Sequence, residues 1–206
     1  MDIKTFPLGP LQTNCYLLAG ETEAVVIDPG GDPAVLVSHL EDNGLTLTHI
    51  LNTHMHFDHT AGNRALSEAT GAPVLAGEKD AYLLDTWLGR GGDMGLPLIE
   101  PFDWLDLEPG VRAFAGMECR ILPTPGHSEG SLTFHFPEMK TAFVGDLIFY
   151  RSIGRTDFPG GDLEVLKKSV REHIFTMPDD TLLLSGHGPE TTVGDEKNHN
   201  PFFGAF

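Results

Sequence analysis

Residues 54–59 contain four side chains that can bind a metal ion: His54, His56, Asp58 and His59. Neutral imidazole and ionised carboxylate are the ligand types that borderline divalent ions prefer. The stretch follows a predicted buried strand at residues 47–52 and precedes a predicted helix at residues 60–70. On such a strand-to-helix turn, the four side chains can point towards one or two common positions. The stretch therefore predicts a metal site.

Three further candidate ligands follow later predicted strands: His127, Asp146 and His187. Each comes directly after a glycine, and a glycine lets the backbone turn sharply and approach closely. Polar side chains at the carboxyl ends of strands gather where sites are usually built. Seven donors exceed the needs of one tetrahedral ion and match two ions that share a bridging carboxylate. Two such ions would deprotonate a bridging water near neutral pH, so the residues predict a two-metal hydrolase.

Short strands and isolated helices must position these donors. Strands are expected at residues 14–19, 24–28, 47–52, 73–76, 112–115, 119–122, 132–136, 141–144 and 181–185. Helices are expected at residues 33–41, 60–70 and 162–175, and an irregular surface loop at residues 88–104. Strand-rich runs interleaved with helices imply sheets with helices on their outer faces, and the alternation is too irregular for a doubly wound parallel sheet. No linker interrupts the chain, so we expect a single domain over residues 1–206.

Composition and charge narrow the classes of partner. Hydrophobic residues make up 40% of the 206 residues, which is enough for a proper core, and the formal net charge is −17. Such an acidic chain argues against nucleic acid and anionic membranes as partners, and we expect a small-molecule substrate. Two cysteines cannot form a disulfide scaffold, and neither a signal peptide nor a long apolar run is visible, so we expect a cytoplasmic protein. The sequence leaves the oligomeric state open.

As a set, these motifs resemble those of the metallo-β-lactamase fold superfamily. The resemblance implies a fold of the α/β (α+β) class, a four-layer αββα sandwich of two mixed β-sheets flanked by helices, with the metals at one edge. It also implies an assignment of the ligands. The first metal would be held by His54, His56 and His127, the second by Asp58, His59 and His187, and Asp146 would bridge them. Asp28 resembles a family aspartate that braces the metal-bearing loop without binding metal.

Within that superfamily the chain is most similar to the glyoxalase II group, the hydroxyacylglutathione hydrolase-like enzymes, and to its short bacterial type. Four stretches carry this likeness: residues 52–63, 124–132, 154–159 and 186–201. Typical glyoxalase II has an added helical C-terminal domain that helps to bind glutathione. Only residues 188–206 follow His187, so we expect that domain to be absent here.

The resemblance and the donor set together suggest hydrolysis of an acyl thioester such as S-lactoylglutathione. A hydroxide held between two divalent ions would attack the carbonyl, and the ions would stabilise the oxyanion. Asp58 would also orient the nucleophile or accept its proton, and the thiolate leaves without a dedicated general acid because thiols have a pKa of about 8.5. Zinc is the first expectation for both ions, and iron or manganese would fit the same ligands. Candidates to receive an anionic substrate tail are Tyr150, Arg151 and Arg155.

Three alternatives stay open at the level of sequence. The ligands His54, His127 and Asp146 match a mononuclear Fe(II) persulfide dioxygenase of the same fold, because two histidines and one carboxylate suit Fe(II) and O₂. Lactone or β-lactam hydrolysis would keep the hydrolytic chemistry on another substrate. A non-enzymatic metal-binding module is disfavoured, since structural zinc usually takes only four ligands, often cysteines.

Overall fold

The computed structural model describes residues 2–93 and 95–204 and contains two six-stranded sheets. In the first sheet, the order β1-β2-β3-β4-β5-β6 follows the chain. Its strands are β1 (Asp2–Leu8), β2 (Thr13–Ala19), β3 (Glu23–Ile27), β4 (Thr46–Leu51), β5 (Val74–Ala76) and β6 (Leu105–Asp106). The first three strands pair antiparallel and the last four pair parallel, so the sheet is mixed.

The second sheet has the order β14-β13-β10-β9-β8-β7. Its strands are β7 (Gly110–Phe114), β8 (Met117–Pro123), β9 (Leu132–Phe136), β10 (Thr141–Gly145), β13 (Leu182–Ser185) and β14 (Thr191–Thr192). Strands β10 and β13 are parallel neighbours, and the other pairs are antiparallel. A small hairpin of β11 (Ile148–Phe149) and β12 (Ser152–Ile153) follows β10.

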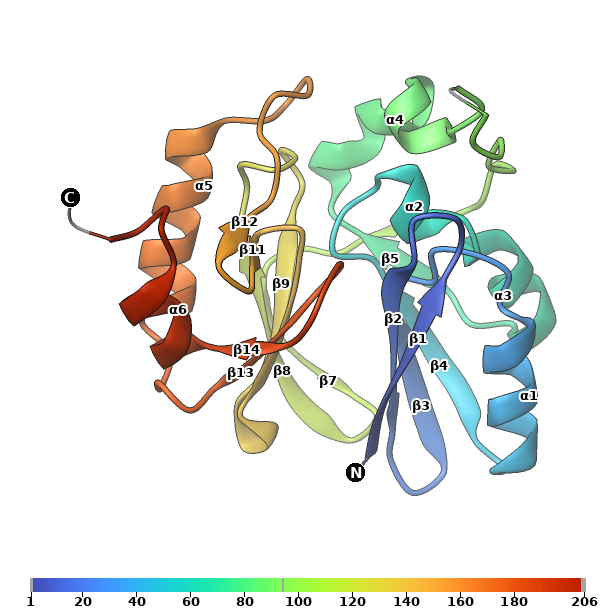
Figure 1. Cartoon of the computed structure of the whole chain (residues 1–206). Helices are drawn as coiled ribbons and strands as arrows, with labels where there is room; N and C mark the ends of the chain where they lie inside the picture. Colours follow the sequence, from blue (N-terminus) through green and yellow to red (C-terminus); the bar gives the residue numbers. More distant parts are fainter. Residues whose placement is uncertain (1, 94, 205–206) are drawn as a thin grey trace.

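Six α-helices are described, and the larger ones cover the outer faces of the two sheets (Figure 1). They are α1 (Ala34–Asp42), α2 (Phe57–Thr60), α3 (Asn63–Thr70), α4 (Trp87–Arg90), α5 (Leu163–Ser169) and α6 (Val193–His199). A π-helical turn, Val170–Ile174, extends α5, and a 3₁₀ helix, Glu78–Asp85, precedes α4. In Figure 1, α1 and α3 lie outside the first sheet, and α5 and α6 lie outside the second.

The period-two pattern of the strands explains why four layers form. In β3, Val25 and Ile27 point into the core between the two sheets, whereas Ala24 and Val26 point towards α1 and α3. The core between the sheets also contains the fully buried rings of Phe134 and others of the second sheet, such as Phe143. The predicted αββα sandwich is therefore confirmed, and the shared core supports our proposal of one domain.

Local signals determine where several elements begin and end. Asp162 caps α5 as expected, because its carboxylate accepts hydrogen bonds from the backbone N–H groups of Glu164 and Val165. The helix expected at residues 60–70 is instead divided into α2 and α3. A Cβ atom at Gly62 would lie 2.3 Å from the carbonyl oxygen of Gly31, so the chain is tightly packed where the two helices meet.

Several elements were not expected from the sequence, and one segment was expected correctly only in part. The unexpected elements include β1, β6, the β11–β12 hairpin, β14, the 3₁₀ helix Glu78–Asp85, α4 and α6. Strand β1 pairs with β2 at the edge of the first sheet, and α6 packs beside β14 near the end of the chain. The segment at residues 88–104 is largely irregular, apart from the end of α4 and one bridge between Gly91 and Leu98; Met94 lies outside the described residues. In residues 2–93 and 95–204, none of the helices has the length and apolar character of a membrane span.

Replacing Phe143 by alanine tests the shared core. The ring is fully buried and contacts Tyr16 of the first sheet and Phe136 of the second edge-on. We expect Phe143→Ala to lower the free energy of unfolding by about 3–5 kcal/mol, measured by urea denaturation. The control Val111→Ala, at a side chain that is 64% exposed, should change it by less than about 0.5 kcal/mol. Equal effects of the two substitutions would contradict a core between the sheets.

Candidate metal centre

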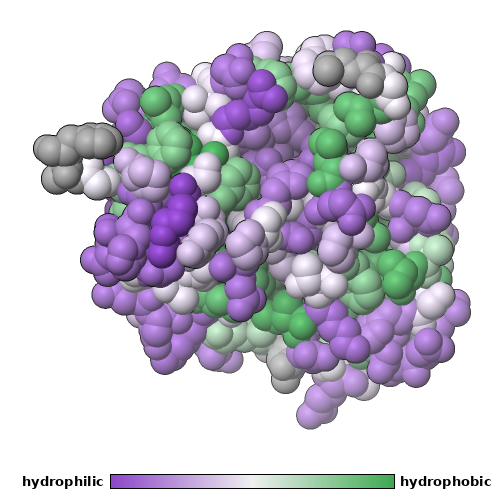
Figure 2. Space-filling view, viewed as in Figure 1, coloured by the Kyte–Doolittle hydropathy of each residue, from purple (hydrophilic) through white to green (hydrophobic). Residues whose placement is uncertain are grey.

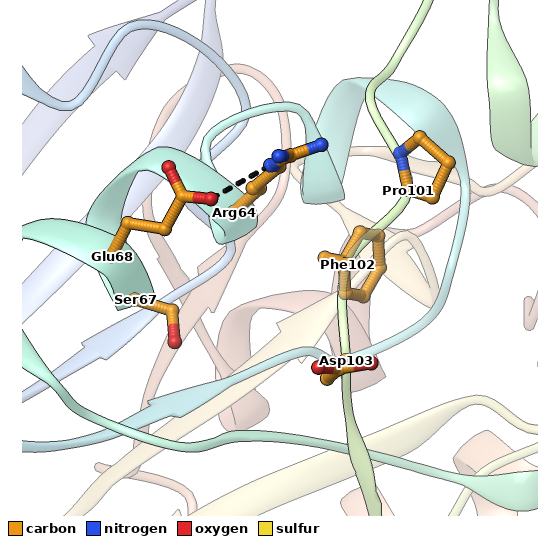
Figure 3. A pocket seen from close by; sticks show the side chains of 6 residues that line it. All are labelled: Arg64, Ser67, Glu68, Pro101, Phe102 and Asp103. Atoms are coloured by element: carbon orange, nitrogen blue, oxygen red, sulfur yellow. Dashed lines mark hydrogen bonds and ion pairs between the residues drawn. The ribbon is translucent and has the colours of Figure 1, made fainter.

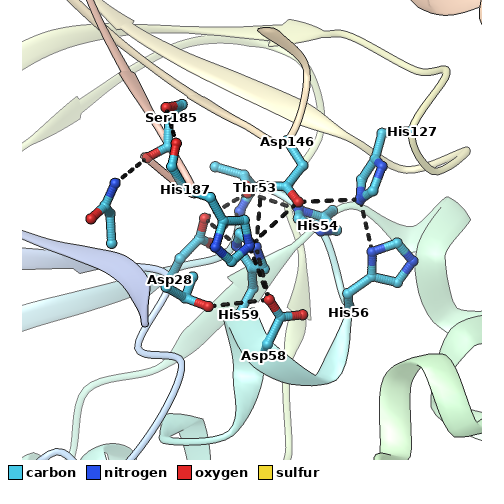
Figure 4. Close-up of polar contacts among 12 residues, drawn as sticks. Asp28, Thr53, His54, His56, Asp58, His59, His127, Asp146, Ser185 and His187 are labelled. Carbon is cyan, nitrogen blue, oxygen red and sulfur yellow. Dashed lines mark hydrogen bonds and ion pairs between the residues drawn. The ribbon is translucent and has the colours of Figure 1, made fainter. Parts of the chain in front are cut away.

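The structure brings all seven predicted donors together at one edge of the two sheets (Figure 4). They are His54 and His56 in the loop after β4, Asp58 and His59 in α2, His127 between β8 and β9, Asp146 after β10, and His187 after β13. Strands β10 and β13 are parallel neighbours, so the residues that follow them emerge side by side. A backbone hydrogen bond from Leu132 to Thr53 ties the second sheet to the loop that bears the first histidines.

The first group of donors consists of three buried imidazoles, those of His54, His56 and His127. The ring planes are nearly perpendicular to one another, with centroids 4.6–4.7 Å apart. Nδ1 of His56 lies 2.8 Å from Nε2 of His127. His127 donates its Nδ1–H to the backbone carbonyl of Arg155 at 2.8 Å, and a carbonyl can only accept. With its proton on Nδ1, His127 turns the lone pair of Nε2 towards Nδ1 of His56 and the rest of the group.

The second group consists of Asp58, His59 and His187. Nε2 of His187 lies 3.1 Å from Oδ2 of Asp58, and Nε2 of His59 lies 3.7 Å from the same oxygen. The side chain of His187 is 30% exposed, so this group is the more open of the two.

Asp146 contacts both groups. Its Oδ2 lies 3.7 Å from Nε2 of His127 and 3.6 Å from Nε2 of His187, while Oδ1 lies 3.4 Å from Nε2 of His59. Asp146 thus lies between the two groups of donors and contacts both.

Unpartnered polar atoms test whether this site fits metal ions. Four buried side-chain atoms of the cluster have no hydrogen-bond partner: Nε2 of His54, His56 and His59, and Oδ1 of Asp146. Buried polar atoms are rarely left unpaired, because each one loses its hydrogen bonds with water. Several buried lone-pair atoms without a hydrogen-bond donor in one site are expected where a metal ion binds. The residues present therefore fit divalent cations.

Burial and neighbouring charges put most of the donors in the state that binds cations. Burial, together with neighbouring imidazoles, lowers the pKa of His54 well below its usual value, and the same causes lower the pKa of His56 to about 3. Burial alone would raise the pKa of Asp146, but His59, His127 and His187 lower it overall. His59 and His187 are the exceptions, because the neighbouring carboxylates, chiefly Asp58 and Asp146, outweigh burial and raise the pKa of both imidazoles. A cation at this place would compete with a proton on His59.

Asp28 braces the loop that bears the metal ligands, as predicted. The carboxylate is buried and accepts hydrogen bonds from the backbone N–H and the hydroxyl of Thr53, at 2.7 and 2.6 Å. It also accepts the Nδ1–H of His59 at 2.9 Å, which leaves Nε2 of that ring free for a metal. Asp28 adopts a positive φ of 53°, a strained conformation for a non-glycine residue that the three bonds hold in place.

A second buried carboxylate, Asp80, was not identified from the sequence. It accepts hydrogen bonds from the backbone N–H of Met55 at 3.0 Å, the hydroxyl of Ser128 at 2.8 Å and the backbone N–H of Gly130 at 2.6 Å. Asp80 thereby joins the loop of His54 and His56 to the loop of His127. Its partners lie 25 to 50 residues away in the chain, so no local spacing signals this role.

The glycine before His187 is required by close packing. A Cβ atom at Gly186 would lie 2.3 Å from Oδ1 of Asp146 and 2.5 Å from Cε1 of His59. Any side chain here would occupy the space at the centre of the cluster. The sequence-based interpretation of this glycine is therefore confirmed.

A cavity of about 740 Å³ opens beside the donors. The cluster contributes His56, Asp58, His127, Asp146 and His187 to its lining. Aromatic side chains also line it, namely Phe57, Trp87, Phe149 and Phe158, together with aliphatic ones from Leu11, Leu88, Leu96 and Ile153. Among the described residues of the lining, Arg155 is the one cationic side chain.

The structure corrects the expected positions of Tyr150 and Arg151, which do not line this cavity. They form the turn of the β11–β12 hairpin, and Arg151 has a positive φ of 58°. The guanidinium of Arg151 contacts Glu196 at 2.7 Å and Asp195 at 2.8 Å, and both belong to α6. The turn directs these side chains towards α6, and only Arg155 of the three candidates reaches the cavity.

Another hollow, of about 330 Å³, lies between α3 and the segment of residues 101–103 (Figure 3). It is lined by Arg64, Ser67, Glu68, Pro101, Phe102 and Asp103, none of which belongs to the donor cluster. Arg64 is paired there with Glu68 at 2.9 Å. The chemistry of the molecule is therefore expected at the larger cavity.

Known proteins with similar sequences and structures were compared with the chain. The family model of the metallo-beta-lactamase superfamily matches residues 8–187. Hydroxyacylglutathione hydrolase GloC of Haemophilus influenzae is 38% identical over 207 residues, which cover 98% of each chain. The crystal structure of BLEG-1 B3 metallo-beta-lactamase superimposes with a TM-score of 0.91 at 38% identity, covering 99% of this chain and 100% of that one. The crystal structure of TTHA1623 in a di-iron-bound form superimposes with a TM-score of 0.85 at 39% identity, covering 97% of this chain and 99% of that one.

We predict that Asp80→Asn weakens the first group of donors. The amide would place an NH₂ group against hydrogen-bond donors, and the loss of bonds to a buried charge should cost about 2–3 kcal/mol of unfolding free energy. Metal bound after dialysis should fall as well, because the loops of His56 and His127 are no longer tied together. The matched control is Asp85→Asn, at an exposed aspartate of the same 3₁₀ helix. Unchanged stability and metal content in Asp80→Asn would show that the carboxylate holds nothing in place.

Proposed function

This chain belongs to the metallo-beta-lactamase superfamily, and we propose that it hydrolyses acyl thioesters by means of two divalent metal ions. One observation carries the proposal: two groups of three donors each share Asp146. A mononuclear iron site would need only His54, His127 and Asp146. It would leave His56, Asp58, His59 and His187 in the cluster without an ion to bind.

The seven residues would hold the ions as the sequence predicts. His54, His56 and His127 would hold one, Asp58, His59 and His187 the other, and Asp146 both. Two bound cations would lower the pKa of a water between them towards neutrality and polarise the carbonyl of the substrate. Histidine and carboxylate ligands suit zinc, iron and manganese, and we propose zinc first.

In this proposal, Asp58 acts on the nucleophile as well as binding metal. Its carboxylate lines the cavity, and Oδ2 accepts a hydrogen bond from the hydroxyl of Thr13 at 3.1 Å. This bond orients the carboxylate, so that its other oxygen is left to orient a water or accept its proton. We therefore assign the catalytic role in the proposal to Asp58.

A thioester suits the groups that the site offers. A thiolate leaves readily, because thiols have a pKa of about 8.5, so a general acid is not required. Of the described residues that line the cavity, those outside the cluster are apolar except Arg155, and none of them is a carboxylic acid. Similarity to hydroxyacylglutathione hydrolase GloC supports the same choice.

The second candidate is β-lactam hydrolysis. Similarity to BLEG-1 B3 metallo-beta-lactamase over nearly the full chain favours it. Both reactions need an activated water and a polarised carbonyl, so the donor cluster serves either one. Nitrocefin hydrolysis, measured beside thioester hydrolysis, separates the two: a higher kcat/KM for nitrocefin would favour the lactamase.

Removal of one ligand tests the hydrolytic site. We expect His54→Ala or His187→Ala to lower kcat/KM for S-lactoylglutathione by more than about 100-fold, since even partners behind the ligands matter by about 10–100-fold. Thiol release, followed with a thiol reagent, is the measurement. His199→Ala removes a side chain that is 60% exposed on α6 and serves as the control. Full activity of the ligand variants would exclude catalysis at the cluster.

The number of ions per chain tests the proposal of two metals. Protein purified from unsupplemented medium should contain close to two equivalents of divalent metal, measured by mass spectrometry of the elements. Chelation should abolish thiol release, and re-addition of two equivalents should restore it. One equivalent of iron, with oxygen consumption on glutathione persulfide, would instead favour the dioxygenase.

A further inference from the structure

The walls of the cavity beyond the donor cluster are apolar. Four aromatic rings and four aliphatic side chains line it, and Arg155 is the one other side chain among the described residues of the lining. They come from separate segments: the β1–β2 turn, α2, α4 with the loop after it, the β11–β12 hairpin and residues 155–158. Figure 2 shows hydrophobic surface near α2 and α4, one of several hydrophobic patches on this face.

Two of these residues extend the apolar wall to the surface. Trp87 is 41% exposed and packs edge-on against Phe158, with ring centroids 5.4 Å apart. Leu11, on the β1–β2 turn, is 46% exposed. Exposed apolar groups of this size at the mouth of a cavity are typical of surfaces that contact apolar ligands.

The one cation of the wall is already neutralised. The guanidinium of Arg155 forms two hydrogen bonds with Asp157, both 2.8 Å long, in a fork-to-fork pair. It also lies 3.5 Å from the centroid of the Phe158 ring. An anionic group of a substrate would have to share this guanidinium with Asp157 or displace it. Arg155, a candidate to receive an anionic substrate tail, therefore lies at the cavity already paired with a carboxylate.

We infer that this cavity selects thioesters with an apolar substituent, such as an aryl or branched alkyl group, over thioesters of a charged peptide thiol. The inference rests on the proposed hydrolase function and names its class of substrate. The peptide of glutathione carries two carboxylates and an ammonium group. In this cavity these charged groups would lose their hydration without gaining hydrogen-bond or ion-pair partners. The transfer of an apolar group from water into the cavity is, by contrast, favourable.

The reaction itself is an ordinary hydrolysis. The oxygen of water forms a bond to the acyl carbon, and the bond between carbon and sulfur breaks. Sulfur leaves with the electron pair and takes up a proton from the attacking water. The products are a carboxylate and a thiol, with the second proton released to solvent, so no oxidant or reductant is needed.

A set of four thioesters tests the inference on the metal-loaded enzyme. Phenylacetyl and lactoyl thioesters of N-acetylcysteamine differ only on the acyl side, and the lactoyl thioester of benzyl mercaptan moves the apolar group to the sulfur side. S-lactoylglutathione supplies the charged carrier. We expect kcat/KM of at least one apolar thioester to exceed that of S-lactoylglutathione by about tenfold or more, the discrimination typical of a hydrophobic pocket. Equal or better hydrolysis of S-lactoylglutathione would overturn the inference.

Two leucine variants give a matched comparison at the wall. Leu11→Ala removes apolar surface from the cavity, while Leu105→Ala removes a leucine that is 59% exposed on β6, outside it. We expect Leu11→Ala, and more strongly Trp87→Ala, to lower the preference for the apolar thioester several-fold. Leu105→Ala should leave the preference unchanged. Preserved circular dichroism shows that each variant is folded, and an unchanged preference in both wall variants would contradict the inference.

Failure of the proposed hydrolase function can be distinguished from failure of the apolar selectivity. If no thioester is hydrolysed, the hydrolase proposal fails, and binding of the two acyl products then tests the cavity alone. Tryptophan fluorescence of the metal-loaded protein should report tighter binding of phenylacetate than of lactate, by about tenfold. Equal binding of the two carboxylates would overturn the apolar selectivity.

Discussion

The structure depends on holding seven imidazole and carboxylate side chains together at one largely buried place. Lone pairs of imidazoles and carboxylates repel one another at distances as short as 2.8 Å unless a cation or proton lies between them. The chain therefore fixes the ligands from behind. The Nδ1–H of His59 binds Asp28, that of His127 binds a backbone carbonyl, and Nε2 of both rings is turned to the centre. Each ring is oriented before any cation arrives.

Two buried carboxylates divide this task between them. Asp28 lies at the end of β3 and holds Thr53 and His59, which belong to the first half of the chain. Asp80 joins the first half to the second, because it binds Met55 on one side and the loop of Ser128 and Gly130 on the other. The cluster thus spans the junction of the two sheets. Its geometry is tied to how the two halves pack.

In our proposals, the chemistry and the substrate selectivity of the molecule come from different parts of the fold. Loops at the ends of the central strands supply the donors, and their positions are fixed by the core between the sheets. Peripheral segments, including α4 and the β11–β12 hairpin, supply the apolar wall of the cavity. Such segments can vary without disturbing the donors, which is the physical basis on which one fold supports many substrates.

The sequence by itself determined the donors, the glycines that precede them and the layered fold. These features are visible because they are local. The ligands in residues 54–59 are close together in the chain, and the pattern of apolar residues that predicts a strand lies within a few consecutive residues. Only the tertiary structure decided the role of Asp80, whose partners lie 25 to 50 residues away. It also decided that Tyr150 and Arg151 turn towards α6 and that Arg155 is neutralised by Asp157. The direction and pairing of a side chain depend on which segments pack against it, and no local pattern contains that information.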